Sequence, residues 1–235
     1  MRAVCPVRRF EIERDRVIIA IDGPAGVGKS TVAKLLAARL GYLYLDTGAL
    51  YRAIAWKTLQ SRIRPTDHDQ VTALLPITSI HMQFRHGAMQ VLVDGIDISG
   101  ELRTPEVTAA ASVVSAIPAV REWLLPIQRQ IGQRGSVVAE GRDMGTKVFP
   151  AAPFKFFLEA DADVRVARRH RELVAAGRDG TVETTSRDLS DRDRRDRTRL
   201  VDPLVPAGDA RLIDTSALSP DQVVEQMIAA VSIGL

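Results

Sequence analysis

A glycine-rich loop between a short apolar run and a helical pattern constrains this chain more than any other feature. Residues 23–30 read GPAGVGKS, which fits the phosphate-loop pattern Gly-x-x-x-x-Gly-Lys-Ser/Thr. A β-branched run at 17–21 precedes the loop, and residues 29–40 have helical periodicity. The glycines let successive backbone amides face one phosphate, and the helix N-terminus adds positive potential. We predict that Lys29 reaches the outer phosphates of ATP and that Ser30 binds magnesium. The predicted ATP-binding residues here are Gly23, Pro24, Ala25, Gly26, Val27, Gly28, Lys29, Ser30 and Thr31.

A phosphate loop alone does not distinguish a kinase from a GTPase or an ATP-driven motor. A GTPase of the usual kind reads guanine with Asn-Lys-x-Asp, and this chain of 235 residues contains no asparagine. The apolar run 137–139 ends in Glu140, as a motor strand could, but it continues directly into Gly141-Arg142-Asp143. An arginine beside the acid suits a second phosphate-bearing substrate better than a water molecule. The sequence therefore favours phosphoryl transfer between two bound substrates.

The rest of the chain alternates short buried-strand patterns with helical ones. Such alternation predicts an α/β fold of the P-loop NTPase type, with three layers in which helices cover both faces of a parallel sheet. We expect strands at 17–21, 43–45, 137–139, 154–158 and 211–213, and helices at 29–40, 48–60, 162–176 and 220–233.

One segment breaks this alternation with strand patterns that follow each other closely. Two of them flank His86-Gly87, and a third follows the turn Asp94-Gly95. Turns of this kind join antiparallel strands, so we predict a small antiparallel insert. Its strands are expected at 80–84, 89–93 and 96–98.

Two further segments complete the predicted organisation. A helical run at 105–133, with interruptions expected at Pro118 and Pro126, returns the chain to the core. Residues 177–206 are polar and rich in charge, and no hydrophobic period there is long enough for a core. We interpret this segment as a mobile lid.

The charge balance favours a small anionic substrate over nucleic acid. The chain has 32 Lys plus Arg against 29 Asp plus Glu, so its formal net charge is only +3. The densest basic run, 192–199, also contains Asp193 and Asp196. A polyanionic substrate explains so small an excess as well as nucleic acid does. We expect no nucleic-acid partner.

Cysteine usage and hydropathy favour a cytoplasmic protein. Cys5 is the single cysteine of the sequence, so no internal disulfide can form. The longest apolar candidate, 109–120, is shorter than the roughly 18 residues that suggest a membrane helix. The N-terminus lacks the apolar region and cleavage site of a secretory signal. We expect a cytoplasmic monomer without a membrane partner, and a flexible N-terminal extension at 1–15.

From about Val17 to the C-terminus, five segments in order make this chain resemble the bacterial cytidylate kinase family. They are 21–24 (IDGP), 45–52 (LDTGALYR), 141–146 (GRDMGT), 192–199 (RDRRDRTR) and 203–206 (PLVP). The resemblance implies transfer of the γ-phosphoryl of ATP to CMP, and also to dCMP, with Mg²⁺. It further implies one nucleoside monophosphate kinase domain at 16–235. Its core is 16–60, 134–176 and 207–235, its monophosphate-binding region with the insert is 61–133, and its lid is 177–206.

A monophosphate acceptor needs a cationic pocket that faces the triphosphate. Arg52, Arg142 and Arg199 are candidates, because an arginine can bind two phosphate oxygens at once. By resemblance all three contact the CMP phosphate, and with Lys29 they form the predicted catalytic set. Thr47 stands where family members often carry serine, and it keeps the hydroxyl.

Cytosine presents a donating amine beside a ring nitrogen and a carbonyl that accept. A pocket for it therefore needs an acceptor and nearby donors. Asp143 resembles the family's acceptor, and Ser112 and Arg121 match positions that hydrogen-bond the base. Tyr51 is a further candidate for the lining of this pocket.

Helical spacing in the lid places Arg192, Arg195, Asp196 and Arg199 on one face and leaves Asp193 and Arg197 elsewhere. Several arginines with one carboxylate suit phosphates and a ribose diol. The resemblance assigns Arg192 and Asp196 to the CMP ribose, and we predict Arg195 as a clamp on the triphosphate of ATP.

Phosphoryl transfer requires little covalent chemistry from the protein, so we predict no general base. Magnesium is expected on Ser30 and the nucleotide phosphates, with either Glu140 or Asp22 acting through water. Family members often carry aspartate at the position of Glu140.

Two other functions fit parts of the pattern. One is the same chemistry on UMP, AMP or dTMP, which base selectivity separates from the CMP reaction. The other is a non-enzymatic protein that binds nucleotides or nucleic acid, which CMP-dependent ADP production would exclude.

Overall fold

The computed structural model describes residues 16–85, 88–178 and 180–234, so the predicted N-terminal extension lies outside the described residues. Its main sheet has five parallel strands in the order β2-β6-β1-β7-β8. All five strands that the sequence predicts are present, with small differences at their ends. They are β1 (Ile18–Asp22), β2 (Leu43–Asp46), β6 (Val137–Glu140), β7 (Phe154–Glu159) and β8 (Arg211–Asp214).

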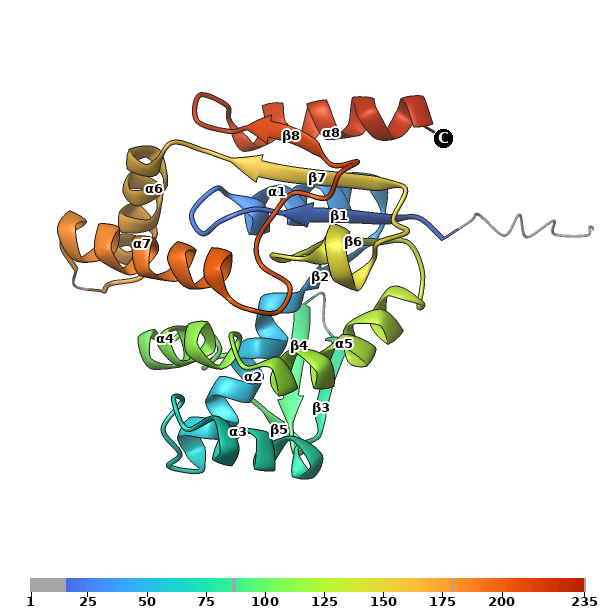
Figure 1. Ribbon diagram of the computed structural model, residues 1–235. Helices are drawn as coiled ribbons and strands as arrows, with labels where there is room; N and C mark the ends of the chain where they lie inside the picture. The colour runs from blue at the N-terminus through green and yellow to red at the C-terminus, as the bar shows by residue number, and fades with distance from the viewer. Residues whose placement is uncertain (1–15, 86–87, 179, 235) are drawn as a thin grey trace, which may run out of the picture.

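Helices cover both faces of this sheet, as Figure 1 shows. In β1, Ile19 and Ile21 face a core formed with α1 and α8, whereas Ala20 faces a second core that contains α2, α4 and α5. This alternation follows from the period of two in a strand. The predicted α/β fold with a parallel sheet between helical layers is therefore confirmed. These helices are α1 (Lys29–Leu40), α2 (Thr47–Gln60), α4 (Pro105–Val114), α5 (Pro118–Gly132) and α8 (Pro220–Gly234).

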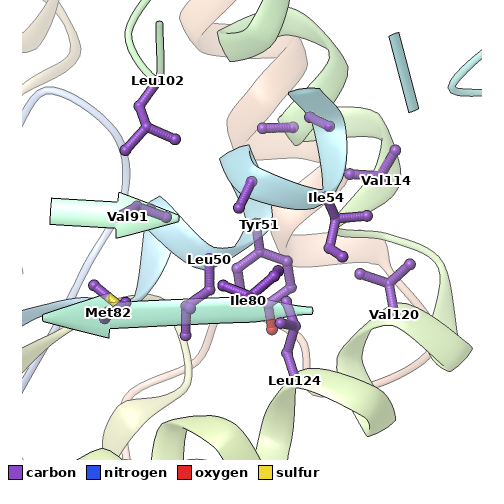
Figure 2. Packing of buried hydrophobic residues seen from close by; sticks show 14 of the residues in the cluster. Leu50, Tyr51, Ile54, Ile80, Met82, Val91, Leu102, Val114, Val120 and Leu124 are labelled. Carbon is purple, nitrogen blue, oxygen red and sulfur yellow. The ribbon is translucent and has the colours of Figure 1, made fainter. Parts of the chain in front are cut away.

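The predicted antiparallel insert is present and packs against α2. Its strands are β3 (Ile80–Arg85), β4 (Ala88–Val93) and β5 (Ile96–Asp97), while His86-Gly87 lies outside the described residues. Figure 2 shows the apolar side chains of the insert and those of α2 in one cluster, which also receives Val120 and Leu124 of α5. The sequence did not predict the helix α3 (His68–Leu74) or the short 3-10 turn η1 (Leu75–Ile77) that precede the insert.

The two prolines of the predicted run 105–133 act differently. Pro118 follows a break and starts α5, where a missing N–H costs little. The expected interruption at Pro126 is wrong, because α5 continues through it. Val120 and Leu124 are fully buried on the same helix, and this packing outweighs a proline cost of about 3 kcal/mol. No single helix in the described residues is long and apolar enough to cross a membrane. Taken together, α4 and α5 meet the length and composition test for a membrane span, but the two helices bend by 102° at the break between them.

The predicted lid segment contains one long helix that packs against its neighbour. Helix α7 (Val182–Thr198) lies alongside α6 (Ala162–Ala175) at the end of the sheet toward which β7 points (Figure 1). Leu189 of α7 forms a small buried cluster with Ala25 of the phosphate loop and Val166 of α6. The sequence did not predict this apolar contact, because a single residue such as Leu189 does not form a hydrophobic periodicity.

Candidate active site

A cavity of about 640 Å³ lies where the carboxyl ends of β1, β2 and β6 meet the lid. Ligands of open parallel sheets bind at this edge. The predicted residues Gly23, Pro24, Val27, Ser112, Arg195 and Asp22 do not line the cavity. Those that line it are Ala25, Gly26, Gly28, Lys29, Ser30, Thr31, Thr47, Tyr51, Arg52, Arg121, Glu140, Arg142, Asp143, Arg192, Asp196 and Arg199.

The phosphate loop connects β1 to α1 with its amides at one end of the cavity. Gly23 has φ +145°, and a Cβ there would lie 2.3 Å from the carbonyl oxygen of Leu158, so only glycine fits. Gly28, with φ +92°, precedes the first helical residue, Lys29. The buried Lys29 ammonium donates to the carbonyl oxygen of Pro24 at 2.6 Å. This end of the cavity combines a helix N-terminus and a cation, the two features that favour a bound phosphate.

Glu140, at the end of β6, is a buried carboxylate beside Ser30. Tyr44 donates its hydroxyl hydrogen to the Glu140 carboxylate, and Thr47 donates to the Glu140 carbonyl at 2.7 Å. Burial, followed by the charge of Asp46 on the adjacent strand, raises the pKa of Glu140, whereas a hydrogen bond from Ser30 acts in the opposite direction. A carboxylate beside a hydroxyl, with a second acid nearby, is an oxygen set suited to a hard divalent cation.

Asp22, the other acid predicted to act on magnesium through water, has different hydrogen-bond partners. Its two carboxylate oxygens accept from the backbone N–H groups of Met144 and Gly145, each at 2.8 Å. These bonds fix the start of the π-helical turn η2 (Met144–Val148), which directly follows Arg142 and Asp143. Asp22 therefore holds the loop that carries two predicted substrate residues.

The raised pKa of Asp22 makes a measurable prediction about stability. Burial raises this pKa from 3.8 to about 6, so the folded state binds the proton more tightly than the unfolded state. The contribution of Asp22 to the free energy of unfolding is greatest below about pH 4. It should fall by up to about 3 kcal/mol as the pH rises through about 6. We expect Asp22→Asn to lack this fall. Urea unfolding of both proteins between pH 4 and 7 measures it, and an identical pH dependence would contradict the assignment.

Cations crowd the middle of the cavity. Arg142 donates through Nε to Asp196 at 2.7 Å. Burial, followed by the charge of Arg142, lowers the pKa of Arg192 to about 10, and the same two causes lower the pKa of Lys29. Within the described residues, buried nitrogens of Arg52 and Arg199 have no hydrogen-bond partner. Buried donors without partners are costly, so an anion that accepts from them would be stabilised here.

At the far end of the cavity Asp143 and Arg121 form a buried ion pair. Their side chains are only 4% and 3% exposed. The Arg199 guanidinium lies 3.8 Å from the other Asp143 oxygen, and the Arg121 guanidinium lies 5.6 Å from the centre of the Tyr51 ring. The two predicted base contacts, Asp143 and Arg121, are thus one hydrogen-bonded unit.

Comparison with known proteins agrees with this geometry. A family model described as cytidylate kinase matches residues 19–232. The chain belongs to the cytidylate kinase family. A cytidylate kinase of Pelotomaculum thermopropionicum is 45% identical over 217 residues, which cover 92% of this chain and 96% of the relative. One of Desulforamulus reducens is 46% identical over 216 residues, covering 92% and 97%. An uncharacterized protein from Eubacterium ventriosum has a solved structure with a TM-score of 0.51 at 16% identity, covering 92% of this chain and 98% of its own, and shows a shared fold.

Two of the residues predicted for this member of the cytidylate kinase family, Arg195 and Ser112, contact each other. Arg195, predicted as a triphosphate clamp, donates through Nε to the hydroxyl oxygen of Ser112 at 3.1 Å. Ser112 is buried on α4. In this structure Arg195 contacts α4 and does not line the cavity, and its role as a clamp on the triphosphate stays a prediction.

Asp193 contacts the phosphate loop, which the sequence interpretation did not predict. Helical spacing placed Asp193 outside the predicted ligand-facing side of the helix. In the structure its side chain is buried and accepts from the backbone N–H of Ala25 at 3.3 Å. It also pairs with Arg165, which donates to the Ala25 carbonyl at 3.1 Å. Asp193 thereby joins the lid helix to the phosphate loop in this kinase. Its signal in the sequence was its place as one of the two acids, with Asp196, within the basic run 192–199.

Proposed function

We propose that this enzyme transfers the γ-phosphoryl of ATP to CMP and to dCMP, giving ADP and CDP or dCDP in pyrimidine nucleotide metabolism. The observation that carries the proposal is one cavity with a phosphate loop at one end and the pair Asp143–Arg121 at the other. Between them lies the cation cluster of Arg52, Arg142 and Arg199. A nucleoside triphosphate and a pyrimidine monophosphate can face each other across such a cluster.

In this proposal catalysis consists of positioning and charge neutralisation. Lys29 stabilises the charge that develops on the transferred phosphoryl, and the three arginines hold the acceptor phosphate in line with it. No residue acts as a general base. Closure of the lid over both nucleotides would exclude water, which otherwise competes as acceptor.

We propose that Mg²⁺ accompanies ATP, held by the Ser30 hydroxyl and by Glu140 through water. The donor set of Glu140 and Ser30 fits this ion, whereas both oxygens of Asp22 already accept backbone N–H groups. We therefore choose Glu140 between the two acids. When bound, the ion supplies charge neutralisation on the phosphate oxygens.

For the acceptor nucleoside we propose that Asp196 accepts from a ribose hydroxyl while it also orients Arg142. Burial alone would raise the pKa of Asp196, but Arg142 and Arg192 lower it overall, so the carboxylate is ionised. The predicted contributions of Arg192, Thr47 and Tyr51 to CMP binding belong to the same proposal.

The Asp196→Ala variant should raise the KM for CMP about 10-fold or more, the cost of a lost charge-assisted hydrogen bond, and affect the KM for ATP less. Steady-state kinetics with each substrate varied in turn measure both constants. Asp191→Ala is the matched control, because Asp191 lies on the same helix, is 40% exposed and, within the described part of the chain, pairs only with Arg194. A tenfold rise for ATP with CMP unchanged would assign this residue to the other nucleotide.

We further propose a cytoplasmic monomer that acts on small molecules, without nucleic acid or membrane as a partner. The support is the near balance of acidic and basic residues, and the interruption of its densest basic run by Asp193 and Asp196. Size-exclusion chromatography with light scattering tests the monomer.

A coupled assay of ADP production across all nucleoside monophosphates tests the proposed function. We expect ADP to form with MgATP when CMP or dCMP is added, and much more slowly with UMP, AMP or dTMP. Preference for another base would replace the acceptor, and ADP production independent of any acceptor would contradict a monophosphate kinase.

A further inference from the structure

Asp202, in the loop after α7, combines a strained backbone with a largely buried carboxylate. Its φ of +48° lies in the left-handed region, which few non-glycine residues adopt. Its side chain is 14% exposed, although the nearby Leu200 is 97% exposed. A residue keeps such a conformation only when its surroundings hold it there, and such residues cluster at functional sites.

The contacts of Asp202 connect the two ends of the proposed CMP site. One carboxylate oxygen accepts from Arg121 Nε at 3.2 Å, and the other lies 3.7 Å from Lys147 Nζ. Its backbone carbonyl accepts from Arg199 Nε at 2.6 Å. One residue therefore contacts both the arginine of the base end and an arginine of the phosphate cluster.

The hydrogen bonds of Arg121 show what Asp202 contributes. A guanidinium has five N–H groups. Arg121 donates through Nε to Asp202, through Nη1 to the carbonyl of Ser115 at 3.3 Å and through Nη2 to Asp143. Two N–H groups have no partner among the described residues, and because Arg121 lines the cavity a ligand can accept from them. The bond from Nε to Asp202 fixes the rotation of the guanidinium and hence the direction of these two groups.

The loop that carries Asp202 is tied to the lid helix. The backbone N–H of Leu204 donates to the carbonyl of Asp196 at 2.8 Å, and the Leu204 side chain is buried. A movement of α7 would therefore carry Asp202 with it. Asp202 thus links Arg121 to the lid helix through this loop.

We propose that Asp202 is a positioning residue for base recognition, which orients the free N–H groups of Arg121 toward the ring nitrogen and carbonyl of cytosine. This inference rests on the proposed function. Uracil carries a hydrogen on that ring nitrogen, so a correctly oriented Arg121 favours cytosine. Asp202 acts through Arg121 and does not touch the substrate.

The test compares Asp202→Gly and Asp202→Asn with wild type. Glycine tolerates the left-handed backbone, so this change removes the carboxylate without adding strain. We expect Asp202→Gly to raise the KM for CMP about 10-fold and to narrow the CMP:UMP ratio of kcat/KM several-fold, with the KM for ATP within about twofold of wild type. Asparagine keeps an accepting oxygen but loses the charge, so its effects should be in the same direction and smaller.

Asp94→Gly is the matched control, because Asp94 also has a left-handed backbone, φ +51°, and holds Lys57 at 2.8 Å outside the cavity. If Asp202→Gly behaves like this control, the inference is wrong. Equal rises of both KM values with an unchanged CMP:UMP ratio would show a merely structural role and also overturn it. If the glycine variant is unstable, a wild-type CMP:UMP ratio in Asp202→Asn overturns it. Failure of wild type to phosphorylate CMP would instead contradict the proposed function.

Discussion

Replacing Lys29 with alanine is expected to lower kcat about 100- to 1,000-fold while the fold stays intact. The variant loses a charge placed on the transferring phosphoryl, and loss of one such donor has this cost in other enzymes. The fold should persist because burial and Arg142 already lower the pKa of the Lys29 ammonium, so its charge does not stabilise the empty protein. Single-turnover and steady-state rates with MgATP and CMP measure the effect.

The control for this prediction is Lys57→Ala, which removes a lysine that pairs with Asp94 on the side of α2 outside the cavity. It should leave kcat unchanged. Circular dichroism and urea unfolding establish that both variants are folded. A near-normal kcat in a folded Lys29→Ala protein would refute the phosphate-loop mechanism.

The second large effect is expected at Asp143, where Asp143→Asn should narrow the preference for CMP over UMP about 5- to 150-fold. The carboxylate can accept from the cytosine amine but would face the carbonyl oxygen that uracil carries there. Asparagine supplies both a donor and an acceptor, so the loss should appear mainly as a lower kcat/KM for CMP. The measurement is kcat/KM for both nucleotides in both proteins at saturating MgATP.

The ion pair with Arg121 adds a stability effect to this prediction. Breaking a buried pair costs about 3 to 5 kcal/mol, so the assays need a temperature at which the variant is folded. Asp209→Asn, which removes an exposed partner of Lys155, is the control. An unchanged CMP:UMP ratio in folded Asp143→Asn would remove Asp143 from the base pocket. A wild type that prefers UMP or AMP would contradict the proposed acceptor.

Local pattern predicted the features of this protein that depend on neighbours in the chain. The phosphate loop needs glycines at fixed spacing and a helix that starts at Lys29, and both are properties of a few consecutive residues. The alternation of strands and helices predicted the parallel sheet, and the closely spaced turns predicted the insert. Arg142 and Asp143 follow the end of β6 after one glycine, so their place at the cavity edge followed from the sequence.

Tertiary structure decided the contacts between residues far apart in the sequence. Asp22 bonds an amide 122 positions away, Asp193 one 168 positions away, and Arg195 reaches Ser112 across 83 positions. Each contact depends on how two separately formed elements pack, and helical spacing gives only the face on which a side chain lies. Helical spacing could not show that Asp193 of α7 contacts the phosphate loop, or that Arg195 contacts α4.

The sequence alone therefore determined the family, the fold class and about half of the residues that line the cavity, because short segments of consecutive residues carry them. The roles of Asp22, Asp193 and Asp202 were decided by the tertiary structure. A buried carboxylate must find hydrogen-bond donors, and which donors lie within reach depends on the packing of the lid, η2 and the sheet.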